Sequence, residues 1–213
     1  MALGQRTNLQ VGGTAARILE HARRAFNERG VANVGVRDIA RELDLSPGNV
    51  SYHFATKEAL IEALIEEGHE QNNRLFALPD KLDFATVDRI IRTILQRDLD
   101  HRWLLRDIAG LIHGMPALRP LNAKMQRVRE ARVDTLVHGL VAAGLLDEAR
   151  VAPALTYLRQ QVVMCVMFAL AYAVVAAPER DLASRLDHNA KTVLALFAGY
   201  CTPAGKRQLA PLL

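Results

Sequence analysis

Apolar residues in the first quarter of the chain recur with the spacing of amphipathic helices, in short runs with clear ends. The first run, 14–29, begins at Thr14, which offers an N-cap oxygen, and ends at Gly30, a residue that readily terminates a helix. Its apolar face consists of Ile18, Ala22, Ala25 and Phe26. The spacing therefore predicts a first helix over 14–29.

Two short helices separated by a tight turn are expected next. The run 36–43 has the apolar spacing of a two-turn helix, and Asp44 can adopt the left-handed backbone angles of a tight turn. Ser46 can cap a second helix in which Pro47 is the first residue, because proline loses no hydrogen bond there. This second helix ends near Phe54.

A longer helix is expected from Lys57, with Thr56 as its cap. Its buried side is formed by Leu60, Ile61, Leu64 and Ile65. Two short helices that are joined by a tight turn and braced by a third form a helix-turn-helix unit, whose second helix can enter a DNA major groove about 12 Å wide. Other helical hairpins give a similar spacing, so the pattern indicates this unit without being specific to it.

The rest of the chain has helical spacing interrupted by proline and glycine, with no sustained period-two alternation. Five further helices are expected, at 84–100, 102–113, 117–143, 149–177 and 180–200. The predicted fold class is therefore all-α with about nine helices: a three-helix head with a helix-turn-helix, and a larger helical domain. The predicted boundaries are a flexible tail at 1–12, the head with the start of the linking helix at 13–72, and the larger domain at 73–213.

The helix expected at 149–177 is apolar on all sides beyond Gln161, so it has to be covered on all sides. One side can pack on its own domain, and the other can meet a partner. We expect a homodimer built from two helices of each subunit, and the alternative is a core helix of a monomer. The predicted interface consists of Leu155, Leu158, Val162, Cys165, Ala169, Leu186, Val193 and Phe197.

Composition supports a mostly helical globular protein, because 50% of the residues are hydrophobic and only 5% are aromatic. The net charge of the chain is +4, and residues 1–57 carry +3 of it, with eight Lys/Arg and five Asp/Glu. That excess fits either a polyanionic partner or a solvated surface.

The sequence indicates a cytoplasmic protein without a membrane span. It has two separate cysteines and no signal-peptide pattern. Its longest apolar run, at 162–177, has sixteen residues, which is too short to cross a bilayer.

The segment from Thr14 to Glu66, above all VRDIARELDLSPGNVSYHFATKEAL at 36–60, closely resembles the amino-terminal domain of the tetracycline-repressor (TetR) family of bacterial transcriptional regulators. The stretch HRWLLRDIAGLIHGMPAL at 101–118 resembles the regulatory domain of one subgroup. The resemblance implies an all-helical homodimer that binds palindromic double-stranded operator DNA, usually as a repressor. It also implies release of the DNA when a small-molecule effector enters the carboxy-terminal domain.

The candidate DNA-binding residues are Arg37, Ser46, Gly48, Asn49, Ser51, Tyr52, His53 and Lys57. Gly48 lets the backbone approach DNA, Asn49 and Ser51 offer hydrogen bonds to bases or phosphates, and Lys57 and Arg37 add charge. The position of Ser51 is aromatic in many members of the family and contacts the DNA backbone there, so the smaller serine is expected to shift this contact to Tyr52. For Tyr52 the alternative is a packing residue, and for His53 and Lys57 a solvated surface.

The candidate ligand-binding residues combine apolar walls with a few polar anchors. They are Trp103, Arg106, Asp107, His113, Met125, Met164, Phe168 and Tyr172. The alternative for the apolar members is ordinary core packing. The basic run Lys124, Arg127, Arg129 and Arg132 is expected to be a solvated helix face.

No metal, cofactor or catalytic residue is predicted, because the histidines lack ligand spacing and the chain has no phosphate loop, nucleophile elbow or zinc-protease motif. The predicted function is a ligand-responsive DNA-binding repressor rather than an enzyme. The alternative is a helical small-molecule-binding or interaction protein whose helix-turn-helix does not bind DNA.

Overall fold

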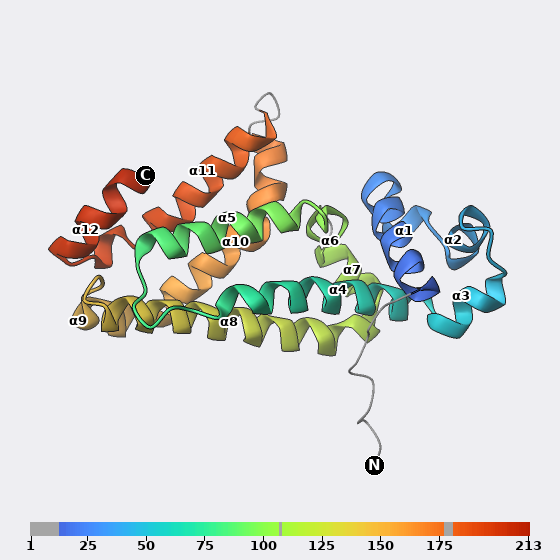
Figure 1. Cartoon of the computed structure of the whole chain (residues 1–213), viewed down its shortest axis with the longest axis horizontal. Helices are drawn as coiled ribbons and strands as arrows, with labels where there is room; N and C mark the ends of the chain where they lie inside the picture. Colours follow the sequence, from blue (N-terminus) through green and yellow to red (C-terminus); the bar gives the residue numbers. More distant parts are fainter. Residues whose placement is uncertain (1–12, 107, 177–180) are drawn as a thin grey trace, which may run out of the picture. The chain divides into compact units, whose positions relative to one another are not determined.

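The computed structural model describes residues 13–106, 108–176 and 181–213, and the predicted tail at 1–12 lies outside them. The chain divides into two compact units, one ending at Glu66 and one running from Glu67 to Leu213 (Figure 1). The division falls within one helix, which is shared by the two units. Throughout the described ranges the secondary structure is helical, which confirms the all-α prediction.

The first unit contains the predicted helix-turn-helix. Its helices are α1 (Thr14–Arg29), α2 (Val36–Glu42), α3 (Pro47–His53) and the first part of α4 (Lys57–Asn73), with a short 3-10 turn, η1 (Val31–Asn33), after α1. Apolar side chains from all four α-helices form the core, among them Ile18, Phe26, Ile39, Val50, Leu60 and Ile61, each fully buried. The expected bounds of the first three helices are confirmed to within about one residue.

Local chemistry explains where these helices begin and end. Asp44 has a φ of 54°, so it occupies the left-handed region that the tight turn requires. The Oγ of Ser46 accepts a hydrogen bond from the amide of Asn49 at 3.1 Å, and Thr56 caps α4 through the amide of Ala59 at 3.1 Å. The expected Thr14 cap is wrong: Thr14 is the first helical residue, and Gly13 stands at the N-cap without a side-chain hydrogen bond.

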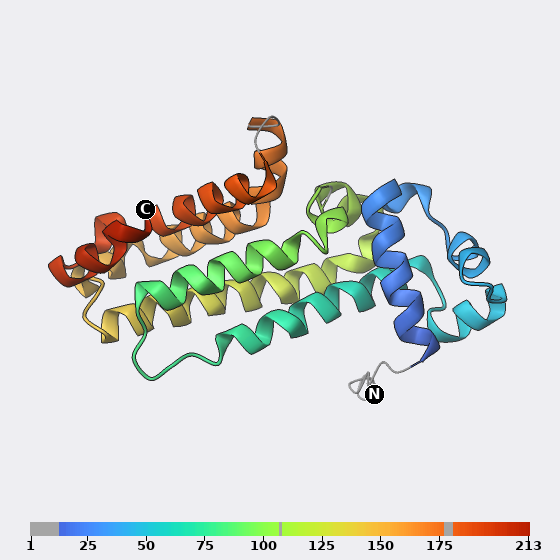
Figure 2. The same ribbon diagram turned by 45° about the horizontal axis from the view of Figure 1, so that its top comes forward.

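The second unit is a helical bundle in which α10 packs against α5, α8 and α11 (Figure 2). Its helices after α4 are α5 (Phe84–Asp98), α6 (Arg102–Arg106), α7 (Ile108–Gly114), α8 (Arg119–Ala142), α9 (Glu148–Val151), α10 (Leu155–Ala176), α11 (Leu182–Ala195) and α12 (Pro203–Leu209). Short 3-10 turns lie between successive helices at Arg74–Phe76, Pro116–Leu118, Ala152–Ala154 and Ala198–Tyr200, and a last one, Ala210–Leu212, follows α12.

The described chain has twelve α-helical segments, three more than the nine or so helices expected. The helix expected at 102–113 is two helices, α6 and α7, and the one expected at 149–177 is divided by Pro153 into α9 and α10. The third addition, α12, begins at Pro203, one of the prolines at which the helical spacing was expected to be interrupted. Proline is instead the first residue of α12, where its missing amide hydrogen is not needed.

The core of the second unit explains the strongly apolar character of α10. Leu158 is fully buried among residues of α5, α8 and α11, and the rings of Phe84 and Phe197 meet edge to face with centroids 6.1 Å apart. By length and mean hydropathy alone, the segment Glu148–Ala173 could cross a membrane. One side of this segment packs in the core, with Leu158, Val162 and Ala169 buried against neighbouring helices, while other apolar side chains of α10 are exposed.

Candidate nucleic-acid interface

α3 presents a polar face outward and is anchored by its apolar face. Val50 is fully buried and Phe54 nearly so, which holds the helix on the core of the first unit. Asn49 and Ser51 are exposed, and Tyr52 is 86% exposed, so Tyr52 is not a packing residue. His53 is half-buried, with its ring 5.2 Å from the ring of Tyr52. α3 therefore presents amide and hydroxyl groups that can donate hydrogen bonds to bases or phosphates.

Gly48 stands on this exposed face without an internal reason to be glycine. A Cβ at this position would meet only the Oγ of Ser46, at 3.9 Å, which is ordinary van der Waals contact. Its φ is not positive, so the backbone does not require glycine either. A glycine that the fold does not need is consistent with a close approach of an external group to the backbone.

The two predicted basic contacts differ in their surroundings. Arg37 on α2 is exposed and forms no ion pair with any residue of the described ranges. Lys57 is half-buried, and its Nζ donates a hydrogen bond to the carbonyl oxygen of Val31, which ties the start of α4 to the turn after α1. Burial lowers the pKa of Lys57. Lys57 thus has a role within the protein that sequence reasoning missed.

An ion-pair network fixes α2 against α1 and thereby positions the helix-turn-helix. Arg29 donates two hydrogen bonds to the carboxylate of Glu42, at 2.8 and 2.9 Å, and His21 Nε2 lies 2.7 Å from the same group. These contacts lower the pKa of Glu42 to about 2, with the Arg29 hydrogen bonds as the main cause. The network joins residues far apart in the chain, so no local pattern in the sequence indicates it.

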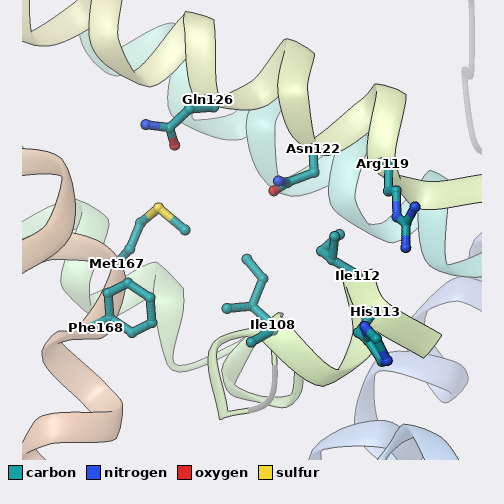
Figure 3. Close-up of a pocket in the computed structure, with 9 residues that line it drawn as sticks. Ile108, Ile112, His113, Arg119, Asn122, Gln126, Met167 and Phe168 are labelled. Atoms are coloured by element: carbon teal, nitrogen blue, oxygen red, sulfur yellow. The ribbon is translucent and has the colours of Figure 1, made fainter. Parts of the chain in front are cut away.

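A cavity of about 400 Å³ opens in the second unit between α7, α8 and α10 (Figure 3). Its walls are Ile108, Ala109, Ile112 and His113 of α7, Arg119, Asn122 and Gln126 of α8, and Met167 and Phe168 of α10. A volume of this size is typical of small-molecule sites, as is a mainly apolar lining with a few polar groups.

The eight predicted ligand residues are distributed over several environments. His113 and Phe168 line the cavity, and Arg106 is exposed on α6. Trp103 and Met125 are buried, Met164 and Tyr172 are exposed on α10, and none of these four lines this cavity. Asp107 lies outside the described residues. Sequence reasoning missed the polar lining from α8, which the spacing of Arg119, Asn122 and Gln126 on one helix face could have indicated.

The basic run on α8 is only partly a solvated face, which corrects the expectation. Lys124 and Arg127 are exposed, but one guanidinium nitrogen of Arg129 lies 3.3 Å from Nε2 of His69 and the other is buried without a hydrogen-bond partner. Arg132 donates a hydrogen bond to the backbone carbonyl oxygen of His69 at 3.3 Å. Burial lowers the pKa values of Arg129 and Arg132 and lowers that of His69 to about 3.

Asp98, at the end of α5, belongs to the same cluster as Arg129 and His69. Burial raises the pKa of its carboxyl group to about 7, although the positive charge of Arg129 acts in the opposite direction. We refer to Asp98, His69 and Arg129 as the polar cluster. Its members come from three helices, so sequence spacing did not connect them.

The predicted dimer seam needs a correction of its residues. Leu158, Val162, Ala169, Val193 and Phe197 are buried in the core of their own subunit. Leu155, Cys165 and Leu186 are partly buried against the same core. The large apolar side chains that remain exposed on α10 form a different stripe, here called the exposed stripe: Tyr157, Met164, Phe168, Tyr172 and Val175.

The chain matches two family models and several known regulators. Residues 18–64 match the model described as "Bacterial regulatory proteins, tetR family", and residues 69–209 match the model described as "Bacterial transcriptional repressor". The chain is 38% identical over 71 residues to the HTH-type transcriptional regulator TtgR of Pseudomonas putida, a match that covers 33% of this chain and 34% of TtgR. Over 129 residues it is 28% identical to the HTH-type transcriptional repressor AcnR of Corynebacterium diphtheriae, covering 60% of this chain and 65% of AcnR.

Solved structures share the fold over nearly the whole length. A TetR-family transcriptional regulator from Marinobacter aquaeolei is similar with a TM-score of 0.80 at 22% identity, covering 94% of this chain and 97% of that one. Salmonella enterica GusR has a TM-score of 0.66 at 21% identity, covering 91% and 99%. The two family models together account for both units, and the chain therefore belongs to the tetR family of bacterial DNA-binding transcriptional regulators.

Proposed function

We propose that the protein is a repressor that binds a palindromic operator as a homodimer in the cytoplasm and releases it when a small molecule binds. The observation that carries this proposal is the exposed polar face of α3, which is held on a buried core by Val50 and Phe54. Such a helix can enter a major groove while its supporting helices stay outside.

The residues on this face divide into two roles. Asn49 and Ser51 can read base edges, because amide and hydroxyl groups match the donors and acceptors of the major groove. Tyr52 and Arg37 can bind phosphates, which positions the head without reading sequence. Gly48 allows the backbone close to the DNA, where a larger side chain would intervene.

The exposed stripe supports the dimer. Large apolar side chains that lie contiguous on a surface mark an interaction site, and Val175 of this stripe is 82% exposed. A second copy of the chain is the occupant that fits, because one helix-turn-helix reads only one half-site. A symmetric dimer places two α3 helices on half-sites about 34–36 Å apart.

The cavity in the second unit is the proposed effector site. A ligand lowers operator affinity only if it prefers an arrangement of the two heads that does not match the operator. The helix α4 runs without a break from the first unit into the second, so it is the element through which this preference is transmitted.

Operator binding tests the proposal. A labelled fragment from the region upstream of the gene should bind much more tightly than random DNA at about 150 mM salt, where non-specific contacts are weakened. Arg37→Gln should reduce the salt slope by about one unit, as expected for one lost phosphate contact. Arg24→Gln makes the same change on α1, where Arg24 is exposed beside Glu20, and should leave the slope unchanged. Equal binding of both fragments would favour an interaction protein with a non-functional helix-turn-helix.

A further inference from the structure

The polar groups of the cavity lie along one face of α8. Arg119, Asn122 and Gln126 are three and four residues apart, so their side chains project from the same side of the helix. Apolar side chains from α7 and α10 face them, namely Ile108, Ile112, Met167 and Phe168 (Figure 3). The cavity is therefore amphipathic across its width, which excludes a uniformly polar ligand as its best occupant.

Gln126 is held in one orientation by a neighbour. Its Nε2 donates a hydrogen bond to Oε1 of Glu130 at 2.9 Å, which occupies the donor end of the amide. The amide oxygen is left on the side of the cavity, and Figure 3 shows it directed toward the space beside Met167. A ligand group at this end has to donate a hydrogen bond, as a hydroxyl or an amine does.

At the end of the cavity away from Gln126, Arg119 favours a ligand group that accepts hydrogen bonds and carries negative charge. It forms no ion pair with any residue in the described parts of the chain, and His113 lies at the same end of the cavity (Figure 3). No aspartate or glutamate lines the cavity among the described residues. Among the described residues Arg119 therefore brings a positive charge to a lining that contains no carboxylate, which favours an anion, and a guanidinium binds a planar carboxylate through two hydrogen bonds.

The length of α8 between these two ends sets the spacing in the ligand. Gln126 is seven positions after Arg119, and a rise of about 1.5 Å per residue places them about 10 Å apart along the helix axis. We infer that the cavity binds an amphipathic carboxylate with an apolar middle and a hydrogen-bond donor about 10 Å from the acid group. The carboxylate binds Arg119, the middle lies on Met167 and Phe168, and the donor reaches Gln126. The effector role of this ligand rests on the function proposed above, but its binding does not.

Calorimetric titration of the full-length protein without DNA tests this inference with three matched probes. The probes are ω-hydroxydecanoate, decanoate, which lacks the donor, and decanediol, which lacks the charge. ω-Hydroxydecanoate should bind most tightly, and loss of the carboxylate should weaken binding about tenfold because a charge-assisted hydrogen bond is lost. Loss of the donor should weaken it by about fivefold, as for a neutral hydrogen bond.

Two variants and one control assign the effect to the cavity. Arg119→Gln should weaken binding of both acids about tenfold and leave decanediol unaffected. Gln126→Met should remove the preference for ω-hydroxydecanoate over decanoate. Arg127→Gln makes the same charge change on the exposed face of α8 and should alter none of the affinities. Because Arg119 and Arg127 are both exposed, unchanged thermal unfolding should accompany either substitution.

Three results would overturn the inference: decanediol binding as tightly as the acids, equal losses in Arg119→Gln and Arg127→Gln, or no binding of any probe at about 1 mM. A protein that binds its operator but none of the probes overturns this inference alone. A protein that binds the probes but no operator overturns the proposed function alone.

Discussion

The polar cluster predicts an unusual pH dependence of stability, because its two titrating groups oppose each other. The pKa of Asp98 is raised by burial to about 7, and that of His69 is lowered to about 3, by burial first and then by the charge of Arg129. Arg132, His101 and Lys124 add smaller effects on His69. Each displacement from the unfolded value makes the free energy of unfolding depend on pH.

Asp98 makes the folded protein less stable as pH rises. A carboxyl group with a raised pKa binds its proton more tightly in the folded state, so its contribution is complete below pH 4 and is lost as pH passes 7. A pKa raised from 3.8 to about 7 lowers the free energy of unfolding by at most about 2.5 kcal/mol between pH 5 and 8. Solvent at the partly exposed edge of the cluster screens this, and we expect about 1.5 kcal/mol.

His69 acts in the opposite direction. Its folded state resists protonation, so its contribution is present above pH 6.5 and is lost as pH falls toward 3. Between pH 5 and 8 the lowered pKa of His69 raises the free energy of unfolding by at most about 2 kcal/mol. Solvent screening reduces the expected gain to about 1 kcal/mol. The two contributions nearly cancel, so this cluster should leave the wild-type protein with almost flat stability across this range.

Urea unfolding at fixed protein concentration, at pH 5, 6, 7 and 8, measures these slopes. In Asp98→Asn the stability should rise with pH by about 1 kcal/mol, because only His69 still titrates. In His69→Gln it should fall by about 1.5 kcal/mol, because only Asp98 does. Asp80→Asn, the same change at an exposed position, is the matched control and should follow the wild type. Parallel curves for wild type and Asp98→Asn would refute the reasoning, whatever the absolute stabilities.

Three other predictions concern the head and the dimer. Gly48→Ala should raise the melting temperature slightly, since alanine favours helices by up to about 1 kcal/mol, yet weaken operator binding in anisotropy titrations; unimpaired binding would remove Gly48 from the contact face. Lys57→Ala should lower the free energy of unfolding by about 1 kcal/mol, because the hydrogen bond to Val31 is lost. It should also lower the salt slope of operator binding by about one unit, as for one lost phosphate contact, and an unchanged slope would leave Lys57 a structural residue only. Tyr172→Glu should give folded monomers in sedimentation, and persistent dimers would exclude the exposed stripe.

The head could be predicted from sequence because its determinants are local. Asp44 in the turn, Ser46 at the cap and Pro47 at the first helical position each act within a few residues, and the structure confirms all three. The position of Lys57 could be predicted in the same way, but its bond to Val31 could not, because it joins residues 26 positions apart. The same limit applies to the network around Glu42.

In the second unit the chemistry depends on which helices meet, and spacing alone does not contain this information. A run of basic residues on α8 reads as a solvated face because charged residues are rarely buried. Arg129 is an exception: it is largely buried, and it interacts with Asp98 and His69, which come from two other helices. The cavity has the same origin, since Arg119 and Phe168 become neighbours of one space only when α8 and α10 pack.

The helix α10 shows why the apolar spacing predicts a dimer seam on side chains that the subunit core buries. A heptad seam can be recognised when polar residues mark the opposite face, but α10 is apolar on every side, so several seams fit the sequence equally well. In the structure the seam through Leu158 and Val162 is buried in the subunit core. The seam through Met164 and Tyr172 has a similar spacing, but its side chains are exposed to solvent. Burying the first seam uses the contacts of α10 within the subunit, whereas the second seam stays exposed, and this difference is why we propose the second seam as the dimer interface.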